Sequence, residues 1–356
     1  MVFAEGKIGK ENAHIPRIKH SPIPANFGVS LLSFKSGTIR IVSKSWLERQ
    51  VAMGVKLYKK PRLKNPVMLA SWPGIANIGL IAVDTLREAL EAEEFGEIEP
   101  WDLFYPQRVS IKSGILEALE FPSSKFYFRK TGKQDLIFFI GEEQPAGGRS
   151  VYAEGEMAYQ IANLVLDVAE KFHCRRVYTS GAAVAPIHHT MVPRVWAVPN
   201  NRDLIAEIKK YENTILMSEI EGREGQGNIV GLNGLLLGVA RKRGIEAICV
   251  MGEMPVYLQG FPLPYPKAAR SVVEVLTRSL GIEVDISKLD RWAEQLEQEI
   301  EDVYSQIPSE IKQQLEKLKQ VTYARPAEPS PITEEDKKRI MEDIDKFFKK
   351  RGRGID

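Results

Sequence analysis

The chain has 356 residues, with 49 Lys and Arg against 47 Asp and Glu, so its formal net charge is only +2. Its hydrophobic content of 44% and charged content of 27% are those of an ordinary globular protein, and no apolar run is long enough to predict a membrane span. The two cysteines, Cys174 and Cys249, are too few for a zinc site by themselves or for a secreted disulfide framework. We therefore expect a cytoplasmic protein with reduced thiols.

The charge is unevenly distributed along the chain. Residues 1–64 hold 13 Lys and Arg against 3 Asp and Glu, which leaves the remainder acidic. This basic N-terminal arm is rich in proline and has little periodicity. It could bind nucleic acid, or fold against its own acidic body or a neighbouring subunit. Because it lacks basic clusters interleaved with aromatic residues, nucleic-acid binding is the least favoured of these readings.

Strand-like and helix-like segments alternate over residues 65–281, which we predict to be the core domain. The expected strands are continuous apolar runs at residues 65–72, 125–130, 135–145, 175–185, 190–199, 214–219 and 246–253. The expected helices cover residues 76–92, 152–172, 201–212, 234–244 and 266–281. Buried strands that alternate with helices predict an α/β layered domain with a mostly parallel sheet.

The pattern changes after the core. Residues 282–323 predict a helical hairpin extension, with helices at 287–307 and 308–320 separated by a proline break. Residues 324–356 predict a proline-rich linker and a tail helix that begins near Thr333. The tail helix presents an apolar face that we expect to bind a partner, formed by Ile340, Ile344, Phe347 and Phe348.

The segment "SWPGIANIG" joins the first core strand to its helix and has two readings. A helix that begins near Ala76, just after Gly74, would point free backbone N–H groups at an anion, and the side chain of Asn77 could donate a hydrogen bond to a phosphate or a carbonyl group. However, the segment has neither the Walker ending nor the three-glycine dinucleotide fingerprint. We therefore favour a tight corner in which Gly79 permits close packing of the helix on the sheet.

Other candidate ligand-pocket residues follow strands or precede a helix. Glu142, Ser180 and Glu253 lie at strand ends, and open α/β sheets bind ligands outside the carboxyl ends of their strands. Asn228 and Asn233 lie in a glycine-rich segment ahead of a helix, which could be a ligand loop or a packed corner. The adjacent Glu142 and Glu143 would point in opposite directions and make a poor acid–base pair.

The neighbouring His188 and His189 suggest metal binding or proton transfer. We expect the two rings to face opposite ways in an extended segment, and no further spacing completes a metal site. Neither cysteine has a nucleophile motif, and the Ser180 segment only half resembles a nucleophile elbow. The sequence therefore predicts no catalytic set, no metal site and no cofactor.

Five segments in register carry a resemblance to a known family: "SWPGIANIGLIAVDTL", "GEEQP", "YTSGA", "GLNGLL" and "GEMPVY". Together they resemble the proteasome assembly chaperone two family over about residues 66–280. The resemblance implies a three-layer α/β/α sandwich similar to purine nucleoside phosphorylases, often assembled into trimers or larger rings. In this family a C-terminal hydrophobic-Tyr-any tripeptide can dock between proteasome subunits, whereas this sequence ends in "RGRGID", with Ile355 in place of the tyrosine.

The resemblance and the missing catalytic set favour a non-catalytic homo-oligomeric scaffold or assembly chaperone. We expect it to bind itself, as a trimer or a multiple of one, and a proteasome-like or other protein partner. The alternative is a phosphorylase-like or hydrolase-like enzyme that acts on a nucleoside or a phosphorylated small molecule. Such an enzyme needs a cation for phosphate, for which Arg149 and Arg194 are the candidates.

Overall fold

The computed structural model describes residues 54–145, 155–219, 227–259, 261 and 263–320, which all belong to one compact unit. The main sheet has nine strands in the order β1-β3-β6-β7-β2-β8-β11-β9-β10. These strands are β1 Val55–Leu57, β2 Val67–Ser71, β3 Glu93–Ile98, β6 Ser124–Arg129, β7 Leu136–Gly141, β8 Arg176–Ala185, β9 Val195–Pro199, β10 Thr214–Leu216 and β11 Glu246–Pro255. Most of the predicted basic arm and the whole predicted tail lie outside the described residues.

The centre of the sheet is parallel and its flanks are not. Strands β7, β2, β8 and β11 run parallel to one another, whereas β6, β3 and β1 pair antiparallel on one side and β9 pairs antiparallel with β11 on the other. The prediction of a mostly parallel sheet is therefore wrong for the flanks. The link between β6 and β7 is a short turn, which can join only antiparallel neighbours.

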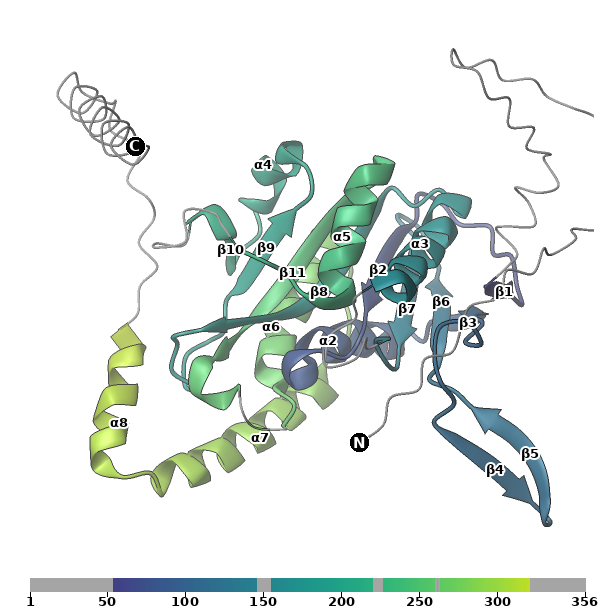
Figure 1. Cartoon of the computed structure of the whole chain (residues 1–356). Helices are drawn as coiled ribbons and strands as arrows, with labels where there is room; N and C mark the ends of the chain where they lie inside the picture. The colour runs from purple at the N-terminus through teal and green to yellow at the C-terminus, as the bar shows by residue number, and fades with distance from the viewer. Residues whose placement is uncertain (1–53, 146–154, 220–226, 260, 262, 321–356) are drawn as a thin grey trace, which may run out of the picture. The chain divides into compact units, whose positions relative to one another are not determined.

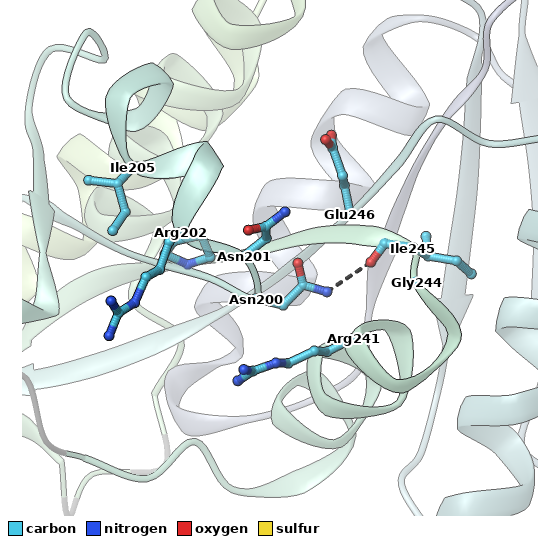
Figure 2. A pocket seen from close by; sticks show the side chains of 9 residues that line it. Asn200, Asn201, Arg202, Ile205, Arg241, Gly244, Ile245 and Glu246 are labelled. Carbon is cyan, nitrogen blue, oxygen red and sulfur yellow. Dashed lines mark hydrogen bonds between the residues drawn. The ribbon is translucent and has the colours of Figure 1, made fainter.

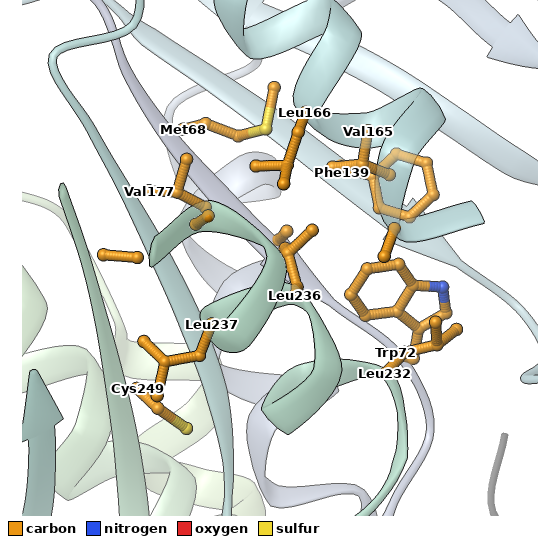
Figure 3. Packing of buried hydrophobic residues seen from close by; sticks show 14 of the residues in the cluster. Met68, Trp72, Phe139, Val165, Leu166, Val177, Leu232, Leu236, Leu237 and Cys249 are labelled. Carbon is orange, nitrogen blue, oxygen red and sulfur yellow. The ribbon is translucent and has the colours of Figure 1, made fainter. Parts of the chain in front are cut away.

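Helices cover both faces of the main sheet (Figure 1). The first face packs against α3 Gly155–Lys171 and α5 Gly231–Arg243, and the second against α2 Ile78–Ala89 and α6 Pro266–Leu280. Because the parallel strands are buried on both faces, they consist of apolar runs such as the fully buried Val67–Ser71. Figure 3 shows part of the first core, where the ring centroids of Trp72 and Phe139 lie 5.0 Å apart and the two side chains share a cluster with Leu232 of α5 and Val165 of α3.

Two helices follow α6. Helix α7, Ser287–Ser305, packs on α6 through buried positions that include Leu289 and Leu296. After Pro308, α8 covers Ser309–Glu316. Both helices were predicted from apolar spacing, whereas the proposed division of the chain at residues 64, 281 and 323 stays a prediction.

Two elements differ from the sequence-based expectation. The helix predicted at 201–212 is only one turn, α4 Ile205–Ile208, preceded by a 3-10 turn in which the side chain of Asn201 accepts a hydrogen bond from the N–H of Asp203. A hairpin at 108–120 was not predicted: β4 Arg108–Lys112 pairs antiparallel with β5 Ile115–Glu120 as a separate two-stranded sheet. Its two-residue Ser113-Gly114 turn has positive φ at both positions, which is the geometry of a tight hairpin turn.

Candidate functional site

The corner between β2 and α2 is built for close packing. A Cβ placed on Gly79 would lie 2.3 Å from the backbone oxygen of Ser180 in β8, so only glycine lets α2 approach the sheet this closely. Ala76 and Asn77 precede the helix in the left-handed region, with φ of 49° and 52°. This geometry agrees with the packing reading of the segment.

A cavity of about 240 Å³ lies beside this corner, at the carboxyl ends of the parallel strands. It brings together three of the predicted pocket residues, Gly74, Asn228 and Asn233. Its remaining lining is Ile75, Gln144, Gly181, Ala182, Ala183, Val184, Trp196, Met217, Ile229, Val230 and Met251. The described lining residues therefore include no acid, base, thiol or cation, and these residues offer a ligand backbone groups, amides and apolar contact.

The start of α5 forms one wall of this cavity. Gln144, which follows β7, accepts a hydrogen bond of 2.9 Å from the backbone N–H of Leu232 and donates to the carbonyl of Pro73. Asn233 is only 7% exposed, and its Oδ1 has no hydrogen-bond partner among the described residues. A buried amide oxygen without a hydrogen-bond partner costs free energy, which sets the Oδ1 of Asn233 apart from the other groups that line the cavity.

The other predicted pocket residues lie elsewhere. Asn77 lines a different hollow, between α2 and the beginning of α7. The exposed Glu142 accepts a hydrogen bond of 2.8 Å from the N–H of Ser123. Ser180 is fully buried in β8 and does not line the cavity.

Glu253 is buried and already bound within the fold. One carboxylate oxygen accepts a hydrogen bond of 2.6 Å from the indole N–H of Trp196, and the other accepts one of 2.9 Å from the backbone N–H of Arg194. Both donors belong to the segment of β9, so the carboxylate holds β9 against β11. This role is structural, and it could not be predicted from the position of Glu253 near a strand end in the sequence.

The two histidines lie together, contrary to the expectation that they face opposite ways. Their ring centroids are 4.2 Å apart, because residues 188–191 form a turn, closed by a hydrogen bond of 3.0 Å from the N–H of Met191 to the carbonyl of His188, instead of an extended strand. The Nδ1 of His189 lies 2.7 Å from the Tyr257 hydroxyl, and its Nε2 lies 3.0 Å from a carboxylate oxygen of Glu301 in α7. Lys267 of α6 donates a hydrogen bond of 2.7 Å to the carbonyl of His189.

These contacts make the histidine pair an anchor for α7. Burial, followed by the charge of His189, lowers the pKa of His188 to about 4, so its ring is neutral at neutral pH. Among the described residues, no three His, Cys, Asp or Glu side chains form a group able to hold a metal ion. None of the helices in this part of the chain has both the length and the apolar character needed to span a membrane.

A wider hollow of about 590 Å³ lies at the other end of the sheet (Figure 2). It contains two exposed cations, Arg202 and Arg241, and no residue that the sequence nominated. Asn200 lines the hollow, but both ends of its side-chain amide already have hydrogen-bond partners. Its NH₂ group donates to the carbonyl of Ile245, and its oxygen accepts from the N–H of Ala247. Among the described residues that line the hollow, no buried side-chain polar atom lacks a hydrogen-bond partner.

Two apolar surfaces were not nominated by sequence reasoning. The first is the β4–β5 hairpin, where Ile111 is 69% exposed and its cross-strand partner Leu116 is 63% exposed. The second is an apolar groove of about 300 Å³ between α7, α8 and the loop after β11. The alternation of apolar and polar residues in "RVSIK" and "ILEALE", on either side of Ser-Gly, could have predicted the hairpin. The sequence does not indicate that its apolar side chains stay exposed.

Comparison with known proteins places this geometry in a family. Over 245 residues the chain is 28% identical to an uncharacterised protein of Methanocaldococcus jannaschii, a match that covers 68% of this chain and 84% of the relative. The crystal structure of Pyrococcus furiosus PbaB, described as an archaeal proteasome activator, is similar with a TM-score of 0.56 and 28% identity, covering 70% of this chain and 98% of PbaB.

A PAC2 family protein from Streptomyces avermitilis shares the fold with a TM-score of 0.55 and 20% identity, over 70% of this chain and 98% of that one. The sequence profile of the PAC2 family matches residues 68–304, a range that contains the five segments and nearly all of α7. The resemblance drawn from those segments is confirmed: the chain belongs to the PAC2 family.

Proposed function

We propose that this protein is a non-catalytic assembly chaperone that binds protein partners through exposed apolar surfaces. The observation that carries the proposal is the β4–β5 hairpin. Val109 lies opposite Leu119, and Ile111 lies opposite Leu116, so cross-strand pairs gather four apolar side chains on one face. All four are exposed.

Exposing such an apolar surface to water costs free energy. Contiguous exposed apolar patches are uncommon on monomers and mark sites of protein association. A short two-stranded sheet is also marginally stable by itself, so a partner that covers the apolar face would stabilise the hairpin as well. The hairpin therefore suits a protein whose work is binding.

The partner that we propose is a proteasome subunit. Support comes from family membership and from PbaB, whose description names it as a proteasome activator. A homo-oligomer, expected to be a trimer or a multiple of one, is part of the same proposal, since a second copy could share the hairpin face. A cytoplasmic location fits the two free thiols of Cys174 and Cys249.

The test is a binding titration of the 356-residue chain against proteasome subunits from the same organism, followed by light scattering. Replacing Ile111 and Leu116 together by threonine removes the apolar pair but keeps a high strand propensity. We expect binding to weaken by at least about tenfold, as for the loss of central interface residues.

The matched control replaces Lys112 and Glu117 of the same hairpin by serine. This removes one positive and one negative charge from an exposed ion pair and leaves the apolar face intact. We expect nearly unchanged binding. Equal binding by the threonine variant and the parent would contradict a role for the hairpin, and no binding by the parent would contradict the partner.

A second candidate function rests on the cavity beside α5. A phosphorylase-like enzyme would bind its substrate at the carboxyl ends of the strands, where Asn228 and Asn233 lie. Against it, no cation is among the described lining residues: Arg194 does not line the cavity, and Arg149 lies outside the described residues. Phosphate-dependent cleavage of a purine nucleoside that Asn233→Ala abolishes would favour the enzyme over the chaperone.

The predicted tail residues Ile340, Ile344, Phe347 and Phe348 lie outside the described residues and remain proposed contacts for a partner. Deletion of residues 332–356 should weaken partner binding or oligomerisation while the body stays folded. If the deletion changes neither, the partner-binding role of the tail is wrong.

A further inference from the structure

The apolar groove beside the C-terminal helices is a second surface that lacks a cover. It is lined by Met254, Tyr257, Leu258, Phe261, Leu263, Pro264, Tyr265, Glu299, Ile300, Val303, Tyr304, Ile307, Ile311 and Leu315. Among these residues, Val303 is 56% exposed and Ile311 is 47% exposed. Because large contiguous apolar surfaces on proteins usually mark interaction sites, we expect another segment or molecule to bind in the groove.

Helix α7, which borders the groove, is acidic, and its Glu299 lines the groove, whereas the Nζ of Lys312 of α8 lies 5.6 Å from the ring centroid of the groove residue Tyr304. Between Glu294 and Asp302, α7 carries five carboxylates and no Lys or Arg. Glu297 pairs with Lys267 and Glu301 contacts His189, whereas Glu294, Glu299 and Asp302 have no ion pair within the described part of the chain. An apolar groove beside this helix favours an occupant that is apolar on one face and basic at its edge.

The chain itself contains such a segment beyond the described residues. The spacing of Ile340, Ile344, Phe347 and Phe348 predicts one apolar stripe on a helix. Basic residues follow at once in "KFFKKRGR", residues 346–353, which contains no acidic side chain. The apolar stripe thus matches the groove in hydrophobicity, and the basic end of the tail, residues 346–353, is opposite in charge to the neighbouring helix α7.

The distance along the chain also suits this pairing. The groove includes Leu315, and the description ends at Gln320, so residues 321–331 lead from the groove rim to the predicted helix. Eleven extended residues span at most about 35 Å, enough to return to the groove. A short linker also gives an effective concentration in the millimolar range, which favours the chain's own tail over that of a second molecule.

We propose that the C-terminal tail of this protein docks as an amphipathic helix in its own groove between α7, α8 and the loop after β11. Phe347 and Phe348 enter the apolar groove, and the basic residues that follow lie along the carboxylates of α7. This contact does not depend on the β4–β5 hairpin, but it competes with the partner contacts proposed for the same tail residues. While the tail is docked, its apolar face is not available to another protein.

Thiol protection tests the docking in the full-length chain. Ile311→Cys places a thiol on the groove, and its rate of reaction with a maleimide reports its exposure. The native thiols give little background, since burial raises the pKa of Cys174 to about 12 and that of Cys249 to about 11. We expect Phe347→Ser with Phe348→Ser to speed the labelling of the introduced groove thiol by about tenfold.

Two controls guard this comparison. Lys338→Ser with Glu342→Ser changes the opposite side of the predicted tail helix without changing the net charge or the basic residues after Phe348, and should leave the rate within about twofold. A thiol at Ile115→Cys, on the β4–β5 hairpin, should react equally in all tail variants. Equal labelling of the groove thiol in the parent tail and in the serine variant would overturn the proposal.

Cross-linking then identifies whose tail is bound. In a chain with Val303→Cys and Phe347→Cys, oxidation should give a disulfide within one molecule, which runs at monomer mass on a non-reducing denaturing gel. A covalent dimer as the main product would contradict docking in the same chain and assign the groove to a second copy. Failure to form either product would overturn the docking itself.

Discussion

The parallel centre of the sheet and the β4–β5 hairpin both carry large apolar side chains, but these are buried in the centre and exposed on the hairpin. In the centre, Phe139 of β7 is fully buried between the sheet and the helix layer. In the hairpin, Ile111 and Leu116 pair across the strands but remain exposed. The difference lies in what covers each surface, because α3 and α5 cover the first while the second has only its own two strands.

This contrast separates stability from binding. Substitutions in the centre should change the free energy of unfolding, whereas substitutions on the hairpin face should change association with a partner. The glycine corner at Gly79 and the histidine anchor of α7 belong with the centre, since each joins two layers of the fold. The following predictions test this division from the largest expected change in stability to the smallest.

Phe139→Ala should cause the largest loss. Removing a fully buried phenyl ring leaves a cavity among Trp72, Phe126 and their neighbours, and such changes cost about 3–5 kcal/mol. Urea unfolding followed by circular dichroism measures the loss. A cost below about 1 kcal/mol would mean that the centre is loosely packed.

Gly79→Ala should destabilise the fold by about 3 kcal/mol, because the added methyl group meets the backbone of Ser180 and forces α2 away from the sheet. Gly238→Ala is the matched control, since Gly238 lies within α5 with no atom near the added methyl group. The control should gain about 0.5–1 kcal/mol from helix propensity. Thermal unfolding of the two variants should therefore shift in opposite directions.

His188 should make stability depend on pH between about 4 and 6.5. Its pKa of about 4 in the fold lies below the ordinary value of 6.5, so the neutral ring is favoured in the folded state. The stabilisation is complete above pH 6.5 and is lost as the pH falls towards 4, by about 2 kcal/mol between pH 7 and pH 5.

The groups that face this ring are His189, Tyr304, Glu301, Glu316 and Lys319. His188→Gln removes the titration and leaves those groups in place. Comparing urea midpoints of the two proteins at pH 7 and pH 5 isolates the contribution of His188. The same pH dependence in both would show that the ring does not titrate in this way.

Leu116→Ala on the hairpin should have the smallest effect on stability. Exposed substitutions usually change the free energy of unfolding by less than about 0.5 kcal/mol, because the side chain is in water before and after unfolding. The same denaturation experiment checks this value. A loss comparable to that of Phe139→Ala would show that the hairpin face belongs to the core.

Sequence reasoning found the elements whose patterns are local. The apolar run at Val67–Ser71 and the helical spacing of α3, α6 and α7 reflect burial on one or two faces, so they can be read from the chain. It missed the antiparallel flanks because the pairing of β9 with β11 depends on long-range contacts such as the Glu253 carboxylate with the Trp196 indole.

The candidate site was harder to predict for the same reason. Gly74, Asn228 and Asn233 meet in one cavity because the corner after β2 and the start of α5 both lie at the carboxyl ends of the strands. Glu142 and Glu253 follow strands as well, yet their carboxylates are bound by backbone and indole groups. Position at a strand end is visible in the sequence, whereas the direction of a side chain and its partners are not.

Native mass spectrometry of the 356-residue chain with proteasome subunits tests the central claim most directly. We predict a homo-oligomer that carries no small molecule and that forms a defined complex with the subunits. We also predict that this complex is lost when Ile111 and Leu116 are replaced by threonine. A protein that forms no complex and instead retains a stoichiometric ligand of nucleotide mass would contradict the chaperone function and favour the cavity beside α5.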